Sequence, residues 1–134
     1  MVLMEKNRHE LDEWLVFWKG KVSPRDQVYA KPVHTWGNQL GYEAEDFVRM
    51  YADTPCISPF SSLALHADGK VPICAVDYNK KILVGDFTRQ SIEEIWNGSE
   101  LMEIRQKHLT ARRNEIPLCR GCHIWEEDHK VWAR

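Results

Sequence analysis

The sequence predicts a mixed α+β domain in which a β-hairpin is followed by helices, with a helix-strand unit before them. Three observations predict this class. A turn signal at Asp68-Gly69 separates two strand-like runs, Ser91 and Glu94 form a helix-capping pair, and residues 7–19 carry an apolar stripe at helical spacing. The four cysteines of the chain lie at positions 56, 74, 119 and 122, around and after the predicted hairpin.

Length and composition are those of a folded globular protein. The 134 residues make about one domain, with 43% hydrophobic and 28% charged residues. A formal net charge of -2 leaves no excess of positive charge to attract nucleic acid. Apolar stretches such as residues 14–18 are far too short to cross a bilayer, and the N-terminus lacks the pattern of an export signal. We therefore expect a cytoplasmic protein that binds neither nucleic acid nor membrane.

The first predicted element is a helix over residues 7–19. Asn7 and Glu10 have the spacing of a reciprocal N-cap pair, and Lys19-Gly20 form a suitable end. Four apolar side chains then share one face: Leu11, Trp14, Leu15 and Trp18.

A strand over residues 27–33 follows the helix after a short turn. Proline has no N–H to donate to a neighbouring strand. Pro32 must therefore either end this strand or belong to a strand at the edge of the sheet. Residues 34–44 have no periodicity and are predicted to be a loop.

The strongest hairpin signal lies between residues 61–65 and 70–74. Asp68-Gly69 supplies the positive φ that a tight turn needs. We therefore predict that these two runs pair with each other as antiparallel strands.

Two helices are predicted after the hairpin. Ser91 and Glu94 form a capping box for the first, and Gly98 ends it before Ser99 caps the second. The second helix has one face that combines two apolar and two basic side chains: Leu101, Ile104, Arg105 and His108.

The four cysteines are the candidate site. Cys119 and Cys122 are spaced so that both sulfurs can bind one metal centre. Cys56 and Cys74 flank the predicted hairpin, which brings them back toward each other. In a reducing compartment such cysteines are metal ligands or redox groups more often than disulfides. The number of thiolates suits zinc and a [4Fe-4S] cluster equally well.

Three other interpretations of the cysteines are weaker. Cys119 to His123 reads C-x-x-C-H, the attachment sequence of haem c, but haem attachment needs export and leaves Cys56 and Cys74 unused. A thioredoxin-like dithiol would follow an early strand and open a helix, whereas this pair follows Pro117 near the C-terminus. Four unligated, buried cysteines fit poorly with the polar neighbours of the C-x-x-C pair.

About half of the chain, residues 55–122, resembles a known family. It is similar to the C-terminal auxiliary cluster domains of radical SAM enzymes, of the SPASM and shorter twitch types. In that family a glycine precedes the second ligand by five positions, as Gly69 precedes Cys74 here. The residues that carry the resemblance are Pro55-Cys56, Pro59-Phe60, Leu63, Asp68-Gly69-Lys70-Val71, Cys74, Asp77, Gly85-Asp86, Ser91-Ile92, Ile95-Trp96, Arg105 and Leu118-Cys119-x-x-Cys122.

The resemblance implies one auxiliary [4Fe-4S] cluster bound by Cys56, Cys74, Cys119 and Cys122, with a role in electron transfer. Full SPASM domains have further cysteines after the C-x-x-C, which bind a second cluster. This sequence has Asp128 and Trp132 in that region and no further cysteine. The C-x-x-x-C-x-x-C of the catalytic cluster is absent, so the resemblance implies a non-catalytic part of a radical SAM oxidoreductase. The alternative is a structural zinc module that acts in binding.

The family resemblance also suggests a structural interpretation of residues 1–54. A helix, a strand and a following loop resemble the last unit of a radical SAM barrel, with residues 55–134 as the cluster domain. The expected partner is the barrel of the same parent chain, of which this sequence is a C-terminal fragment. Side chains in the loop after the strand, such as His34, Trp36 and Gln39, would then face substrate. The apolar face of helix 7–19 lacks its barrel neighbour, so we expect it either to fold back onto the cluster domain or, as we prefer, to pair two copies of the chain.

Overall fold

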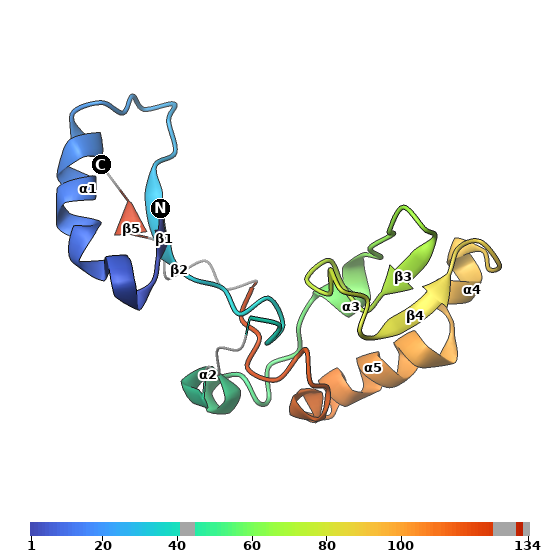
Figure 1. The fold of residues 1–134 in the computed structure, drawn as a ribbon. Helices are drawn as coiled ribbons and strands as arrows, with labels where there is room; N and C mark the ends of the chain where they lie inside the picture. Colours follow the sequence, from blue (N-terminus) through green and yellow to red (C-terminus); the bar gives the residue numbers. More distant parts are fainter. Residues whose placement is uncertain (41–44, 125–130, 133–134) are drawn as a thin grey trace. The chain divides into compact units, whose positions relative to one another are not determined.

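A computed structural model describes residues 1–40, 45–124 and 131–132. Its contacts divide the chain into two compact units. The first holds Met1–His34 together with β5 (Val131–Trp132), and the second begins at Thr35. Helices and short sheets occur in both (Figure 1), which confirms the α+β class. A cluster domain that begins at residue 55 stays a prediction.

The first unit is built on a short sheet. β1 (Val2–Leu3) pairs in parallel with β2 (Tyr29–Pro32), and β2 pairs antiparallel with β5. β2 lies within the predicted strand, and Pro32 is its last residue, as its missing N–H requires. Between the two parallel strands the chain passes through a helix, so β1, the helix and β2 form a strand-helix-strand unit. No helix in the described part of the chain is long and apolar enough to cross a membrane.

The helix of this unit starts differently from the prediction. The chain first forms the 3-10 helix η1 (Glu5–Glu10), and α1 spans Leu11–Lys19. Asn7 is not an N-cap for Glu10, because its Oδ1 accepts the backbone N–H of Met4 at 2.7 Å at the start of η1. The predicted apolar face is confirmed as the less exposed side of α1: Leu11, Trp14, Leu15 and Trp18 are half-buried.

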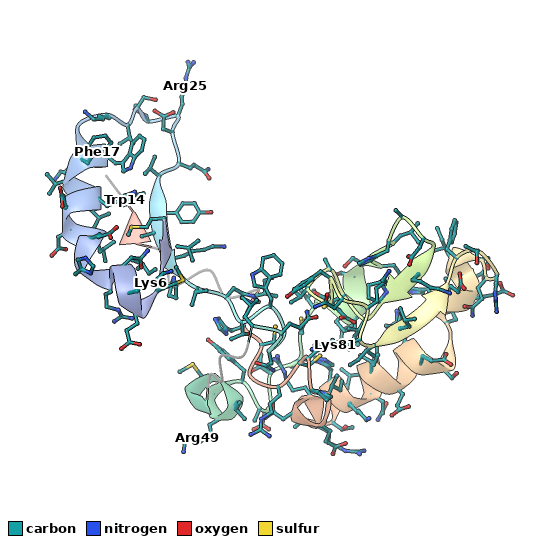
Figure 2. All side chains as sticks on the ribbon, in the orientation of Figure 1. Lys6, Trp14, Phe17, Arg25, Arg49 and Lys81 are labelled. Atoms are coloured by element: carbon teal, nitrogen blue, oxygen red, sulfur yellow. The ribbon has the colours of Figure 1, made fainter. Side chains whose placement is uncertain are left out.

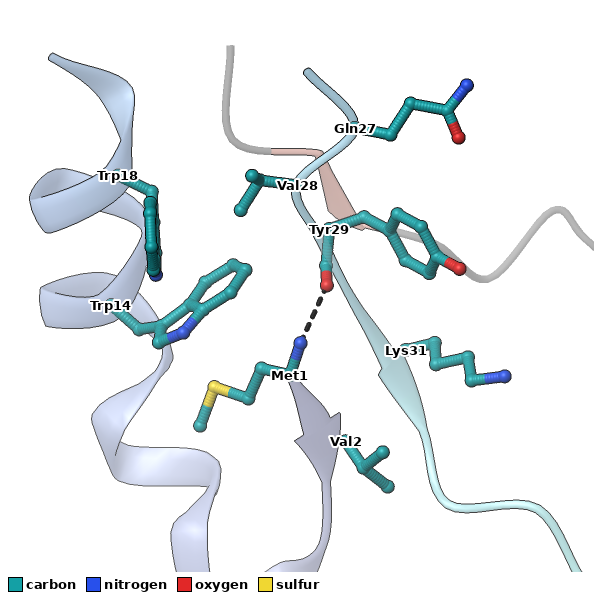
Figure 3. Close-up of a pocket in the computed structure, with 8 residues that line it drawn as sticks. All are labelled: Met1, Val2, Trp14, Trp18, Gln27, Val28, Tyr29 and Lys31. Atoms are coloured by element: carbon teal, nitrogen blue, oxygen red, sulfur yellow. Dashed lines mark hydrogen bonds between the residues drawn. The ribbon is translucent and has the colours of Figure 1, made fainter. Parts of the chain in front are cut away.

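That face lines a pocket of about 370 Å³ within the first unit. Trp14 projects from α1 toward the strands (Figures 2 and 3). Trp18 does the same (Figure 3), and the two ring centroids lie 6.3 Å apart. On the opposite side the amino group of Met1 donates to the carbonyl of Tyr29 at 2.8 Å. The remaining lining residues are Val2, Gln27, Val28 and Lys31. The α1 face is therefore partly covered by strands of its own unit.

The second unit contains a two-stranded antiparallel sheet, β3 (Lys70–Pro72) with β4 (Leu83–Asp86). The predicted pairing of residues 61–65 with 70–74 is wrong. Residue 61 ends the short helix α3 (Ser58–Ser61), and the run continues to a turn in which Gly69 has the predicted positive φ, +79°. Lys70 pairs with Asp86 across the sheet at 2.6 Å.

Both helices after the sheet are present. The Ser91 Oγ accepts the Glu94 N–H at 3.1 Å and the Glu94 carboxylate accepts the Ser91 N–H at 2.7 Å, which confirms the capping box of α4 (Ile92–Trp96). α5 spans Ser99–Leu109, and Gly98 rather than Ser99 is its N-cap. Its predicted face is confirmed, since the buried residues of α5 are Leu101, Ile104, Arg105 and His108.

The sheet, α4 and α5 enclose one apolar core. Arg105 reaches across it and donates to the carbonyls of Pro59 at 2.8 Å and Trp96 at 2.7 Å, with its guanidinium 4.2 Å from the Trp96 ring centroid. α2 (Glu45–Met50) and the 3-10 helix η2 (Arg113–Glu115) complete the second unit. The buried members of the core are Val71, Ile73, Val84, Ile95, Leu101, Ile104, Ile116, Leu118 and Cys119.

Gly85 is needed for the contact between β4 and α4. A Cβ at this position would lie 2.6 Å from Cγ1 of Ile95, which is 1% exposed and cannot easily move. We expect Gly85→Ala to lower the free energy of unfolding by about 1–3 kcal/mol, measured by urea denaturation. Gly20→Ala is the control, because its Cβ would meet nothing within 4 Å. Equal stability of the two variants would contradict this packing.

Candidate metal centre

The four cysteines come from separate segments of the second unit. Cys56 precedes α3, Cys74 follows β3, and Cys119 and Cys122 lie in the turns after η2. Cys119 and Cys122 are buried, Cys56 and Cys74 are half-buried, and all are free thiols. Cys119 also packs in the apolar core, so the C-x-x-C pair is anchored to the rest of the unit.

The fold brings the four thiols within electrostatic reach of one another. Burial raises the pKa of Cys74, Cys119 and Cys122, and negative charge on the neighbouring thiols raises it further. Cys56, Cys74 and Cys122 act on Cys119 in this way, Cys56 and Cys122 act on Cys74, and Cys56 acts on Cys122. Among the described residues, no group of three or more His, Cys, Asp or Glu side chains has the arrangement that would hold a metal ion.

Backbone N–H groups lower the pKa of two of the thiols. Those of Val76 and Asp77 act on Cys74, and those of Gly37 and Ile124 act on Cys122. Each of these effects opposes the larger effect of burial, because N–H donors favour the thiolate. Hydrogen bonds to ligand sulfurs are also one of the means by which proteins set the potential of iron-sulfur clusters.

A buried arginine holds the segments that carry the cysteines. Arg113 is 1% exposed. Its guanidinium donates to the carbonyls of Thr54 at 2.8 Å, Cys119 at 2.9 Å and Cys122 at 2.7 Å. The positive charge lowers the pKa of Cys119 and Cys122, against the effect of burial. Sequence analysis did not identify Arg113, because Arg112-Arg113 looks like an ordinary charged surface segment.

His108 supports the segment of Cys56. Its Nδ1 accepts the backbone N–H of Cys56 at 3.1 Å, so the ring proton lies on Nε2. Burial, together with the charge of Arg113, lowers the pKa of His108 to about 4, so the ring is neutral at neutral pH. Nε2 is buried and has no partner among the described residues, which leaves one buried N–H donor unused.

The loop Thr35–Gln39 packs against the C-x-x-C turn. Asn38 Nδ2 donates to the carbonyls of Pro117 at 2.8 Å and Arg120 at 2.7 Å, and Gln39 Nε2 donates to the carbonyl of Val76 at 2.9 Å. The predicted loop is therefore part of the cysteine site, and the amide of Gln39 is bound to backbone there.

This loop has an unusual backbone. Trp36, Gly37 and Asn38 follow one another with φ of 51°, 65° and 62°, a left-handed conformation that is costly for tryptophan. A Cβ on Gly37 would lie 3.1 Å from the carbonyl oxygen of Leu118. The dipeptide Gly37-Asn38 signals a turn in the sequence, but a local signal cannot reveal a contact with residues 117–122.

The chemistry of these groups suits thiolate ligands of a metal centre, although the described side chains do not form a ready-made ligand arrangement. Four converging thiols, backbone N–H donors at two sulfurs, a buried positive charge and an unused N–H of His108 all favour bound negative charge. His123, the axial ligand that haem c would need, is 8% exposed, with its Nδ1 3.3 Å from the Gly121 carbonyl oxygen.

Comparison with known proteins agrees with this site. Residues 56–123 match the SPASM family, an iron-sulfur cluster-binding domain. The chain is also 26% identical over 72 residues to the S-adenosyl-L-methionine-dependent 2-deoxy-scyllo-inosamine dehydrogenase of Niallia circulans. The match covers 54% of this chain but only 29% of that enzyme, and no solved structure matches the chain. The family match spans half of the chain and contains all four cysteines, so this chain belongs to the SPASM family of iron-sulfur cluster-binding domains.

Proposed function

We propose that the second unit binds one [4Fe-4S] cluster through Cys56, Cys74, Cys119 and Cys122. The observation that carries the proposal is the convergence of four thiols, each within electrostatic reach of the others. The N–H donors at Cys74 and Cys122 support it, because such bonds stabilise ligand thiolates. Membership of an iron-sulfur family favours iron over zinc.

The proposed role is electron transfer. A bound cluster of this kind supplies one-electron chemistry. Four protein thiolates would leave no iron position for a substrate, so the residues favour transfer of an electron over direct binding of substrate. Burial of Cys119 and Cys122 in the unit also excludes water from the ligands, which limits loss of the cluster to solvent.

We infer that the first unit derives from the end of the barrel of a radical SAM oxidoreductase. The parallel strand-helix-strand arrangement of β1, α1 and β2 supports this origin, because β/α barrels repeat that unit. The parent barrel is then the natural partner, and free thiols at a metal site fit a reducing cytoplasm. Pairing of two copies through the apolar face of α1 stays a prediction. Trp14 and Trp18 of that face already line a pocket within the first unit.

The metal content tests this function directly. Protein purified without oxygen should be brown and contain iron and acid-labile sulfide in equal amounts. All four iron ligands from protein should be cysteines of this chain. Colourless protein with one zinc per chain would replace the proposal by the structural zinc module. A haem spectrum would contradict both.

The chain alone should not cleave S-adenosylmethionine. The sequence contains no C-x-x-x-C-x-x-C, the ligand set for the cluster that starts radical chemistry in the family it resembles. Reduced, cluster-loaded protein incubated with S-adenosylmethionine is therefore expected to release no 5'-deoxyadenosine above a protein-free control, measured by liquid chromatography. Turnover would show that the chain carries a catalytic centre of its own.

A further inference from the structure

Arg113 is a buried charge without a carboxylate. It is 1% exposed, and among the described residues no acidic side chain lies within ion-pair distance of it. A buried, unpaired ion costs several kcal/mol of desolvation, which neutral carbonyl partners offset only in part. The fold therefore keeps a positive charge that its own carboxylates do not balance.

The negative charge that would balance it lies at the cysteines. Arg113 acts electrostatically on Cys119 and Cys122, and it binds the carbonyls of both. Four thiolates outweigh the positive charge of an iron-sulfur core, so the loaded site is negative overall.

The contacts of Arg113 also join separate parts of the site. Its Nη1 donates to Thr54, two residues before Cys56, and its Nη2 donates to the carbonyls of Cys119 and Cys122. One planar group thus fixes the spacing of the first ligand segment relative to the C-x-x-C turn. A lysine carries the same charge but cannot make these contacts together.

We propose that Arg113 is the built-in counter-charge of the metal cluster, so that it raises the cluster's reduction potential. The inference rests on the proposed function. Reduction adds an electron and hence negative charge to the site, and a fixed positive charge nearby favours that state. Removal of the charge should make the cluster harder to reduce.

The test compares R113Q, which removes the charge, with R113K, which keeps it, in the full chain. Both are loaded and studied without oxygen, with iron content, visible and electron paramagnetic resonance spectra, and the midpoint potential from dithionite titration with mediator dyes. We expect a clearly more negative potential for R113Q and a potential near that of wild type for R113K. Retention of iron by R113K but not by R113Q would also support the counter-charge.

R105Q is the matched control. Arg105 is also buried, at 9% exposed, and also donates to carbonyls, but these belong to Pro59 and Trp96 and not to cysteines. Its loss should lower stability and leave the potential unchanged.

Two results would overturn the inference. One is a loaded R113Q protein with the potential of wild type. The other is complete loss of iron from R113K as well as R113Q, which would show that contact geometry and not charge is required. A wild-type chain that contains zinc and no iron would contradict the proposed function and not this inference. In that case the zinc content of R113K is compared with that of R113Q, and a higher content in R113K would support the counter-charge.

Discussion

Cys119→Ala is expected to release most of the bound metal and to destabilise the second unit more than Cys56→Ala does. Metal binding to such a site is largely folding energy, so loss of one ligand should cost several kcal/mol in either variant. Cys119 also belongs to the apolar core at 9% exposed, whereas Cys56 is only half-buried. Removal of its sulfur should add about 1 kcal/mol through lost burial.

Metal analysis and thermal unfolding separate the two contributions to this effect. In the presence of metal both variants should melt well below wild type. After the metal is removed by a chelator, Cys56→Ala should melt close to the metal-free wild type, and Cys119→Ala should remain lower. A Cys56→Ala protein with full metal content and an unchanged melting temperature would remove Cys56 from the ligand set.

Only one half of the cysteine site has a local signal in the sequence, since the sequence links Cys56 and Cys74 only through a predicted hairpin that does not form. C-x-x-C at Cys119 and Cys122 is a spacing, and the capping box at Ser91 is a pair of residues three positions apart. α4 and α5 lie where these signals place them, with ends shifted by about one residue, a normal uncertainty for helix boundaries.

Pairing between distant segments could not be found in this way. β3 pairs with β4, but Gly85-Asp86 at the end of β4 looks like a turn, while residues 61–65 alternate like a strand. Core packing determines which strands pair, because Val71 of β3 and Val84 of β4 are both buried in the same core. A strand pair depends on such tertiary contacts more than on local propensity.

The same limit applies to the loop Thr35–Gln39, whose contacts lie far along the sequence. Asn38 is separated from its partners, Pro117 and Arg120, by 79 and 82 residues. The loop also lies outside the region that matches the family, residues 56–123. The structure nevertheless makes it one wall of the metal centre, through Gly37 and Asn38.

Asn38→Ala should therefore weaken metal binding although residue 38 lies outside the family match. The substitution removes two hydrogen bonds to the C-x-x-C turn and places alanine at a φ of 62°. Together these changes should cost about 2–4 kcal/mol in the free energy of unfolding. They should also speed the release of metal to a chelator, followed by the loss of visible absorption.

Two further substitutions at this position separate backbone strain from hydrogen bonding. Asn38→Gly tolerates the left-handed φ but lacks the amide, so it should recover part of the stability and still lose metal quickly. Asn38→Asp keeps the shape of the side chain, but its carboxylate has no N–H to donate to the carbonyls of Pro117 and Arg120. It should therefore release metal at least as fast as Asn38→Ala. Release rates equal to wild type in all three variants would show that the C-x-x-C turn holds its shape without this loop.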